Sequence, residues 1–126
     1  MSRTLDALVA EKVMAWPIIT EHTPYRCHRD TAGGVVVRRD DGSLMAHIFQ
    51  VGRGTPVYWF PTSNASDDYE VLKHVRENWD RGNQLEFARA LFSIQRQRGV
   101  FSFHPGYHYE PGDFSRAALK AIGEEV

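Results

Sequence analysis

The sequence predicts an α+β fold, a layered α/β sandwich in which about four helices pack on an antiparallel or mixed sheet. Two observations predict it. Apolar residues recur at helical spacing in four segments, and β-rich runs fill the space between the first two; the helical segments are residues 5–16, 66–79, 84–99 and 114–123. We expect one domain over residues 1–126, because a chain of this length with 42% hydrophobic residues can bury a core.

Polar residues mark where the later helices begin. Asn64 or Ser66 can cap the second helix, since their side chains accept a hydrogen bond from a free backbone N–H of the first turn. Asn83, with Glu86 three residues later, resembles the capping box of a third helix. Asp113 is expected to cap the last helix.

The strands are predicted mainly between residues 18 and 60. Two β-rich runs flank Asp41–Gly42 in GGVVVRRDDGSLMAHIFQVG, and glycine tolerates the positive φ that a hairpin turn requires. Further short strands are indicated at three places, residues 23–30, 56–60 and 103–109. The predicted order is therefore one helix, several strands, two helices, a strand and a helix.

Composition excludes some classes of protein. The net charge of −1 argues against general nucleic-acid binding, because such proteins are usually basic. With Cys27 as the single cysteine, no internal disulfide forms, which fits a reducing compartment. No apolar run approaches the roughly 20 residues that span a bilayer, and the first residues lack the pattern of a signal peptide. We expect a cytoplasmic protein without a membrane partner.

Three passages resemble a known family. They are LDALVAEKVMAW near the start, FPTSNASDDYEVLKHV in the middle and YHYEPGDFSRAALKAIG at the end. They are similar to the phage ABA sandwich domain family, small proteins encoded by bacteriophages and prophages. The resemblance implies a phage origin, a layered α/β fold and an unassigned function, and it brings no catalytic motif. Residues 17–56 depart from the family's shorter members.

The stretch FHPGYHYEPGDF, residues 103–114, is the densest group of chemically active side chains. On a strand, His108 and Glu110 share one face while Tyr107 and Tyr109 share the other. No zinc-ligand spacing accompanies the histidines, so we predict no metal site and no cofactor. Pro111–Gly112 reads as a turn, which leaves ligand contact by His104 to Tyr109 as the functional alternative to a purely structural role.

Arginines and aromatic residues elsewhere extend this hypothesis. Guanidinium groups suit phosphates and aromatic rings stack on bases, although a charged hairpin tip and core packing explain many of the same residues. Cys27 and His28 would point to opposite faces of a strand, so they do not form a nucleophile–base pair. The predicted ligand contacts are Tyr25, Arg26, His28, Arg38, Arg39, Arg53, Tyr58, Trp59, His104, Tyr107, His108 and Tyr109.

These observations favour a non-enzymatic phage accessory protein. We expect it to bind and sequester a small anionic ligand, such as a cyclic nucleotide or cyclic oligonucleotide that signals in bacterial immunity, in the cytoplasm of the infected cell. Exposed aromatic residues would suit a homo-oligomer. Two alternatives stay open: a histidine-dependent phosphodiesterase or nuclease that uses His104 and His108, and a protein–protein inhibitor of a host factor.

Overall fold

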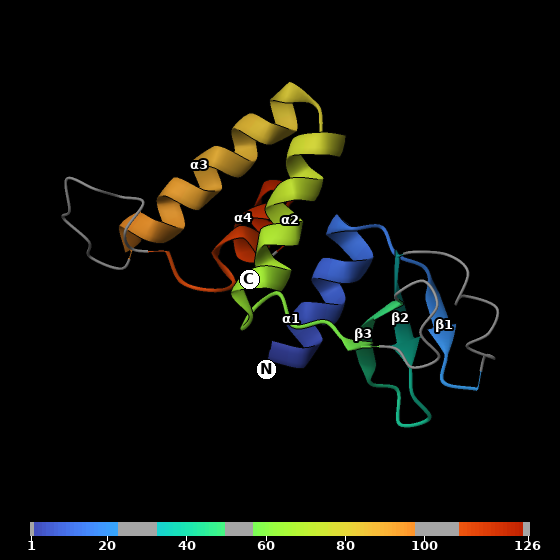
Figure 1. Cartoon of the computed structure of the whole chain (residues 1–126). Coiled ribbons are helices and arrows are strands. Elements are labelled where there is room, and N and C mark those ends of the chain that lie inside the picture. Colours follow the sequence, from blue (N-terminus) through green and yellow to red (C-terminus); the bar gives the residue numbers. More distant parts are fainter. Residues whose placement is uncertain (1, 23–32, 50–56, 98–108, 125–126) are drawn as a thin grey trace. The chain divides into compact units, whose positions relative to one another are not determined.

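The computed structural model describes residues 2–22, 33–49, 57–97 and 109–124 (Figure 1). The chain divides into two compact units, Met1–Phe60 and Pro61–Val126, which we describe separately. Within the described residues there are four helices and a four-stranded mixed sheet, which confirms the predicted α+β class. Whether residues 1–126 fold as one domain stays a prediction.

The first helix starts as the α-helix α1 (Ser2–Leu8) and continues as the wider π-helical turn η1 (Val9–Val13). The backbone N–H of Met14 donates to the carbonyl oxygen of Val9 at 3.1 Å, which is the spacing of a π-turn. Pro17 follows shortly and cannot continue a helix. The chain then enters the sheet directly.

The sheet of the first unit has the strand order β1-β2-β3-β4, with strands β1 (Ile18–Thr20), β2 (Gly33–Arg38), β3 (Leu44–Phe49) and β4 (Val57–Tyr58). β1 pairs with β2 in parallel, and the other two pairs are antiparallel. The predicted hairpin at Asp41–Gly42 is confirmed, since Gly42 has a φ of 85° and Gly42 N–H donates to Arg39 O at 2.9 Å. The predicted short strand near residue 57 is also confirmed.

The core of the first unit joins the first helix to the sheet. α1 packs against β3, and η1 packs against β2. A Cβ at Gly34 would lie 2.1 Å from the ring of Trp16, so only glycine allows the ring to lie this close to the strand. Trp16 in turn contacts Trp59, with ring centroids 4.5 Å apart. Val35 and Val37 are buried together with Ile19 beside them.

The second unit consists of the helices α2 (Ala65–Asn78), α3 (Arg81–Gln97) and α4 (Asp113–Ala121). α4 packs against both of the others. Aromatic side chains also contact one another in this unit. The ring of Phe87 on α3 lies 6.3 Å from that of Trp79 and 6.4 Å from that of Phe114, measured between centroids. In the described part of the chain, no helix has the length and apolar character needed to cross a membrane.

The helix caps of the second unit follow the prediction in one case and differ in another. Asn64 caps α2, as predicted, by accepting the backbone N–H of Asp67 at 3.0 Å. The capping box predicted at Asn83 is wrong. Asp80 accepts the Asn83 N–H at 2.8 Å, so α3 begins at Arg81. Asp80 caps α3 in place of Asn83, because its carboxylate lies about one turn earlier in the chain and accepts the free N–H groups there.

Candidate functional site

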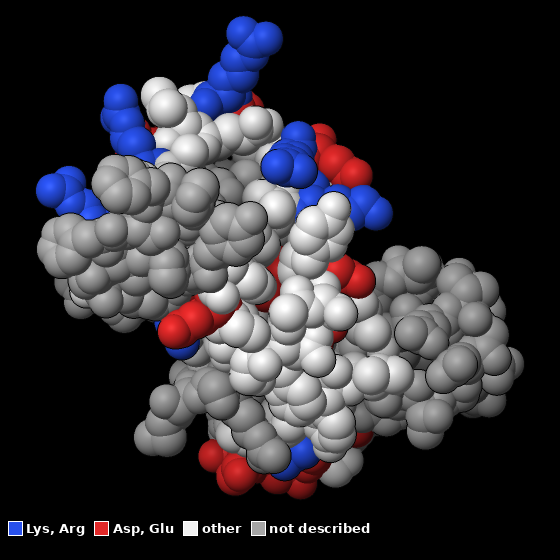
Figure 2. All heavy atoms as spheres, turned by 60° about the vertical axis from the view of Figure 1, so that its left-hand side comes forward, with Lys and Arg blue, Asp and Glu red and all other residues white. Residues whose placement is uncertain are grey.

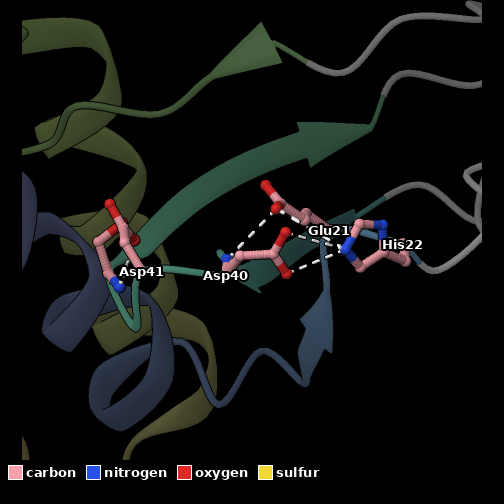
Figure 3. A network of polar contacts seen from close by, with 5 residues as sticks. Glu21, His22, Asp40 and Asp41 are labelled. Carbon is pink, nitrogen blue, oxygen red and sulfur yellow. Dashed lines mark hydrogen bonds and ion pairs between the residues drawn. The ribbon is translucent and has the colours of Figure 1, made fainter.

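The parallel pairing of β1 with β2 brings together the residues that follow the two strands. Thr20 lies opposite Arg38 at the carboxyl ends of the strands, and the Glu21 N–H donates to the Arg38 carbonyl oxygen at 3.0 Å. The chain then turns, so that Glu21 and His22 lie beside Asp40 (Figure 3). We call Glu21, His22 and Asp40 the strand-end cluster.

Hydrogen bonds hold the strand-end cluster together. Nε2 of His22 lies 2.9 Å from Oδ1 and 3.2 Å from Oδ2 of Asp40, and the Asp40 N–H donates to Oε1 of Glu21 at 3.2 Å. The hydrogen bond with Asp40 raises the pKa of His22 and lowers the pKa of Asp40. Both side chains are largely exposed to water, which screens the pair, so the pair adds little to stability.

The strand-end cluster also has the donor types of a metal site. One ligand atom from each side chain lies within 4.8 Å of the other two, and an imidazole nitrogen with carboxylate oxygens suits divalent transition metals. The hydrogen bonds within the cluster account for the same close approach without an ion. We therefore treat the cluster as an ion-pair network that fixes the end of the sheet.

Arg38 is the last residue of β2, and Arg39 follows it at the hairpin turn. Arg38 is exposed and Arg39 is half-buried. In the hairpin turn, Oδ1 of Asp41 accepts hydrogen bonds from the backbone N–H and the hydroxyl of Ser43 at 2.9 and 2.6 Å. These hydrogen bonds lower the pKa of Asp41. Among the described residues, neither arginine forms an ion pair. Because Arg38 and Arg39 are adjacent, their side chains leave the chain toward opposite faces of the sheet.

Aromatic side chains lie on one face of the same sheet. The strand register places Tyr58 opposite His47, and His47 opposite Val35, so the three side chains share a face. The rings of His47 and Tyr58 meet edge-on with centroids 4.8 Å apart, and Tyr58 stacks on Phe60 at 5.8 Å. Tyr58 is nevertheless 47% exposed. Its ring is thus held in place by neighbours and still offers area to a ligand.

His47 is a buried polar residue of this face. It is only 7% exposed, and neither of its ring nitrogens has a hydrogen-bond partner in the part of the chain that the structure describes. Burial lowers the pKa of His47, and the positive charge of Arg39 lowers it further. The uncharged form of the His47 ring is therefore favoured, by burial first and by the positive charge of Arg39 second.

Trp59 belongs to the core instead. It is 1% exposed, and its ring packs against Trp16. Its backbone N–H donates to Ala46 at 3.0 Å, one position beyond the end of β4. The side chain thus fills the layer between the first helix and the sheet, and we leave it out of the surface that a ligand would meet.

In the second unit, Tyr109 has a structural partner. Its hydroxyl donates to Oδ2 of Asp68 on α2 at 2.7 Å. The same carboxylate accepts the backbone N–H groups of Gly112, Phe114 and Ser115 at 3.0, 3.2 and 2.8 Å. Burial, followed by the hydrogen bond to Asp68, raises the pKa of Tyr109. Asp68 therefore ties the start of α4 to α2.

The prediction that Asp113 caps α4 is wrong. Gly112 holds the cap position with a φ of 100°, and Asp113 is the first helical residue. The Asp113 carboxylate instead accepts the Glu110 N–H at 3.0 Å. Because the Asp68 carboxylate already binds the free N–H groups at the helix start, no second carboxylate is needed there.

The remaining predicted site residues lie outside the described residues. This set includes the two histidines of the proposed hydrolase, and it comprises Tyr25, Arg26, His28, Arg53, His104, Tyr107 and His108. Of the predicted contacts, the first unit brings Arg38, Arg39 and Tyr58 to the same sheet. Sequence reasoning missed Glu21, His22 and Asp40, which follow two strands whose parallel pairing no local pattern reveals.

Comparison with known proteins gives no relatives. No protein-family model, curated protein or solved structure matches this chain. The resemblance to the phage ABA sandwich domain family stays a prediction.

Proposed function

We propose that this chain is a non-enzymatic accessory protein whose first unit binds and sequesters a nucleotide-type ligand. The base would stack on Tyr58, and the phosphates would bind Arg39. Arg38, one position earlier on β2, points to the opposite face of the sheet. One observation carries the proposal, the half-exposed ring of Tyr58 held between His47 and Phe60. An aromatic side chain fixed in this way loses little freedom when a base stacks on it.

Charge supports the same ligand class. Arginine forks bind phosphate oxygens with two parallel hydrogen bonds, and the nearby acids are already engaged, Asp40 by His22 and Asp41 by Ser43. One stacked base contributes about 1–3 kcal/mol.

The wider role follows from the predicted phage origin. A protein that withholds a cyclic nucleotide or cyclic oligonucleotide from bacterial immunity needs tight binding and no turnover. Pairing of subunits around one symmetrical ligand would raise the affinity, which favours a homo-oligomer. The site of action would be the cytoplasm of the infected host cell.

Calorimetry with a panel of cyclic and linear nucleotides at low salt tests the proposal. We expect saturable binding of at least one nucleotide, which Tyr58→Ala weakens and Tyr58→Phe retains because phenylalanine keeps the stacking ring. Tyr69→Ala is the matched control, since Tyr69 is an exposed tyrosine of the second unit. Binding of no nucleotide in the panel would overturn the proposal.

Recovery of the ligand separates sequestration from hydrolysis. After incubation and denaturation of the protein, a sequestering protein returns the nucleotide intact. A phosphodiesterase or nuclease would return products instead. Chromatography of the released nucleotide distinguishes the two.

A further inference from the structure

Helix α3 carries a stripe of exposed arginine and apolar residues. Arg81, Leu85, Arg89, Phe92 and Arg96 follow one another at steps of four, four, three and four residues, so they line one face of the helix. Leu85 is 52% and Phe92 59% exposed. We call these five residues the α3 stripe.

The opposite face of α3 forms the core contact. Phe87 and Ala90 are buried there, and α3 packs against α4. The two large apolar side chains of the α3 stripe are therefore not needed to hold the helix in its unit. An exposed leucine and phenylalanine two turns apart on one helix face are the kind of surface that a partner covers.

The charge of the α3 stripe is uniformly positive. Within the described residues, Arg81 and Arg96 form no ion pair, and Arg89 contacts Glu86 at 3.2 Å beside the stripe. Figure 2 shows Lys and Arg side chains in the upper part of the view, with Asp and Glu side chains beside some of them. The stripe thus alternates three positive groups with two apolar ones.

We propose that the α3 stripe docks an acidic amphipathic helix of a partner protein. Such a helix would place Asp or Glu opposite the arginines and apolar side chains opposite Leu85 and Phe92, which is recognition of a helix by apolar anchors with a charged rim. This inference is independent of the proposed nucleotide site, which lies in the other unit.

A second copy of the chain fits this surface poorly. In an antiparallel pair centred between Leu85 and Phe92, Arg81 of one helix lies opposite Arg96 of the other. A parallel pair places each arginine beside its own copy. Like charges meet in both arrangements, and such contacts are unfavourable.

Nucleic acid and membrane also fit less well than an acidic helix. Phosphates would satisfy the arginines but would leave Leu85 and Phe92 without apolar contacts, and the whole chain has a net charge of −1. An anionic lipid surface usually recruits helices with a broader apolar face than two side chains.

Fluorescence anisotropy with a synthetic peptide tests the inference. The probe is a labelled helical peptide with Glu and Leu spaced to oppose the α3 stripe, and the control peptide has Lys in place of Glu. We expect saturable binding of the Glu peptide to the full chain at low salt, at least tenfold tighter than binding of the Lys peptide.

Variants of the chain locate the contact. Leu85→Ala with Phe92→Ala should weaken binding of the Glu peptide at least tenfold, and Arg89→Glu should weaken it similarly. Lys73→Glu on α2 removes a positive charge outside the stripe and should change affinity less than twofold. Circular dichroism confirms that each variant is folded.

Three binding results would overturn the inference. They are no saturable binding of the Glu peptide, equal loss of binding in the Lys73→Glu control, and stripe-dependent binding of a 20-base-pair DNA or of phosphatidylglycerol vesicles that is tighter than binding of the peptide. Self-association that depends on Leu85 and Phe92 in sedimentation measurements would also contradict it.

Discussion

The carboxylate of Asp68 on α2 lies at the start of α4, where its Oδ1 accepts the backbone N–H of Ser115 at 2.8 Å across 47 residues of sequence. Its Oδ2 accepts the N–H groups of Gly112 and Phe114. The first N–H groups of a helix lack partners within the helix and carry partial positive charge. A side chain from another helix therefore caps α4, and the cap also fixes how α2 and α4 pack.

Replacing the cap should destabilise the second unit. Asp68→Asn keeps the shape of the side chain but removes its charge and turns one acceptor into a donor, which leaves buried N–H groups unpaired. We expect a loss of about 3 kcal/mol in the free energy of unfolding. Asp67→Asn, the neighbouring acid in the first turn of α2, should cost less than about 1 kcal/mol. Urea denaturation compares the two, and equal losses would refute the capping role.

Tyr109 should contribute through its hydroxyl. Tyr109→Phe keeps the stacking on Phe114, whose ring centroid is 4.9 Å away, but loses the hydrogen bond to Asp68. A hydrogen bond to a charged group is worth about 1.5–3 kcal/mol. Because the pKa of Tyr109 is raised in the folded state, its contribution is complete below the ordinary tyrosine pKa of about 10 and declines as pH rises above it. The difference in urea midpoint between the original protein and the Tyr109→Phe variant should therefore be smaller at pH 11 than at pH 8.

His47 should make the first unit sensitive to acid. Its folded-state pKa is lowered, so the unfolded chain binds a proton first, and stability falls as pH drops below about 6.5. His47→Phe keeps an aromatic edge beside Tyr58 and removes two unpaired nitrogens. We expect the urea midpoint to fall less between pH 7.5 and pH 5.5 in this variant than in the original protein. An unchanged decrease would show that His47 is not buried as a neutral ring.

The His22–Asp40 pair should titrate in the opposite sense. The raised pKa of His22 means that its stabilisation is present below about pH 6.5 and is lost as pH rises through the folded-state pKa. Asp40→Asn removes the carboxylate, so the pKa of His22 measured by NMR should fall back toward its ordinary value. Asp41→Asn is the control, because Asp41 bonds to Ser43 instead. A His22 titration curve that is the same in the Asp40→Asn variant would contradict the pairing.

Local patterns in the sequence were enough to predict the elements that local chemistry decides. The hairpin at Asp41–Gly42 needs a residue that tolerates positive φ, and the cap of α2 at Asn64 needs an acceptor two or three residues before free N–H groups. Both are recognisable from a few neighbouring residues. The apolar spacing that predicts helices is likewise a property of one segment.

Contacts between distant segments could not be predicted in this way. Asp68 looks like an ordinary acid at the start of a helix, and nothing near it in the sequence reveals that α4 begins against it. His22 and Asp40 meet only because β1 pairs with β2 in parallel, and a three-residue strand gives little signal. Tyr58 and Trp59 are adjacent in sequence, yet one is exposed and the other is core, because the layer above each face decides their burial.

The central claim is that the first unit binds a nucleotide-type ligand on the sheet face that carries Arg39 and Tyr58. The most direct measurement is an amide NMR titration of the full chain with a nucleotide found to bind. We predict that the largest shift changes fall on Arg39, His47 and Tyr58, and that residues of α2 and α3 change little. Largest changes in the second unit, or none above background at saturation, would contradict the account.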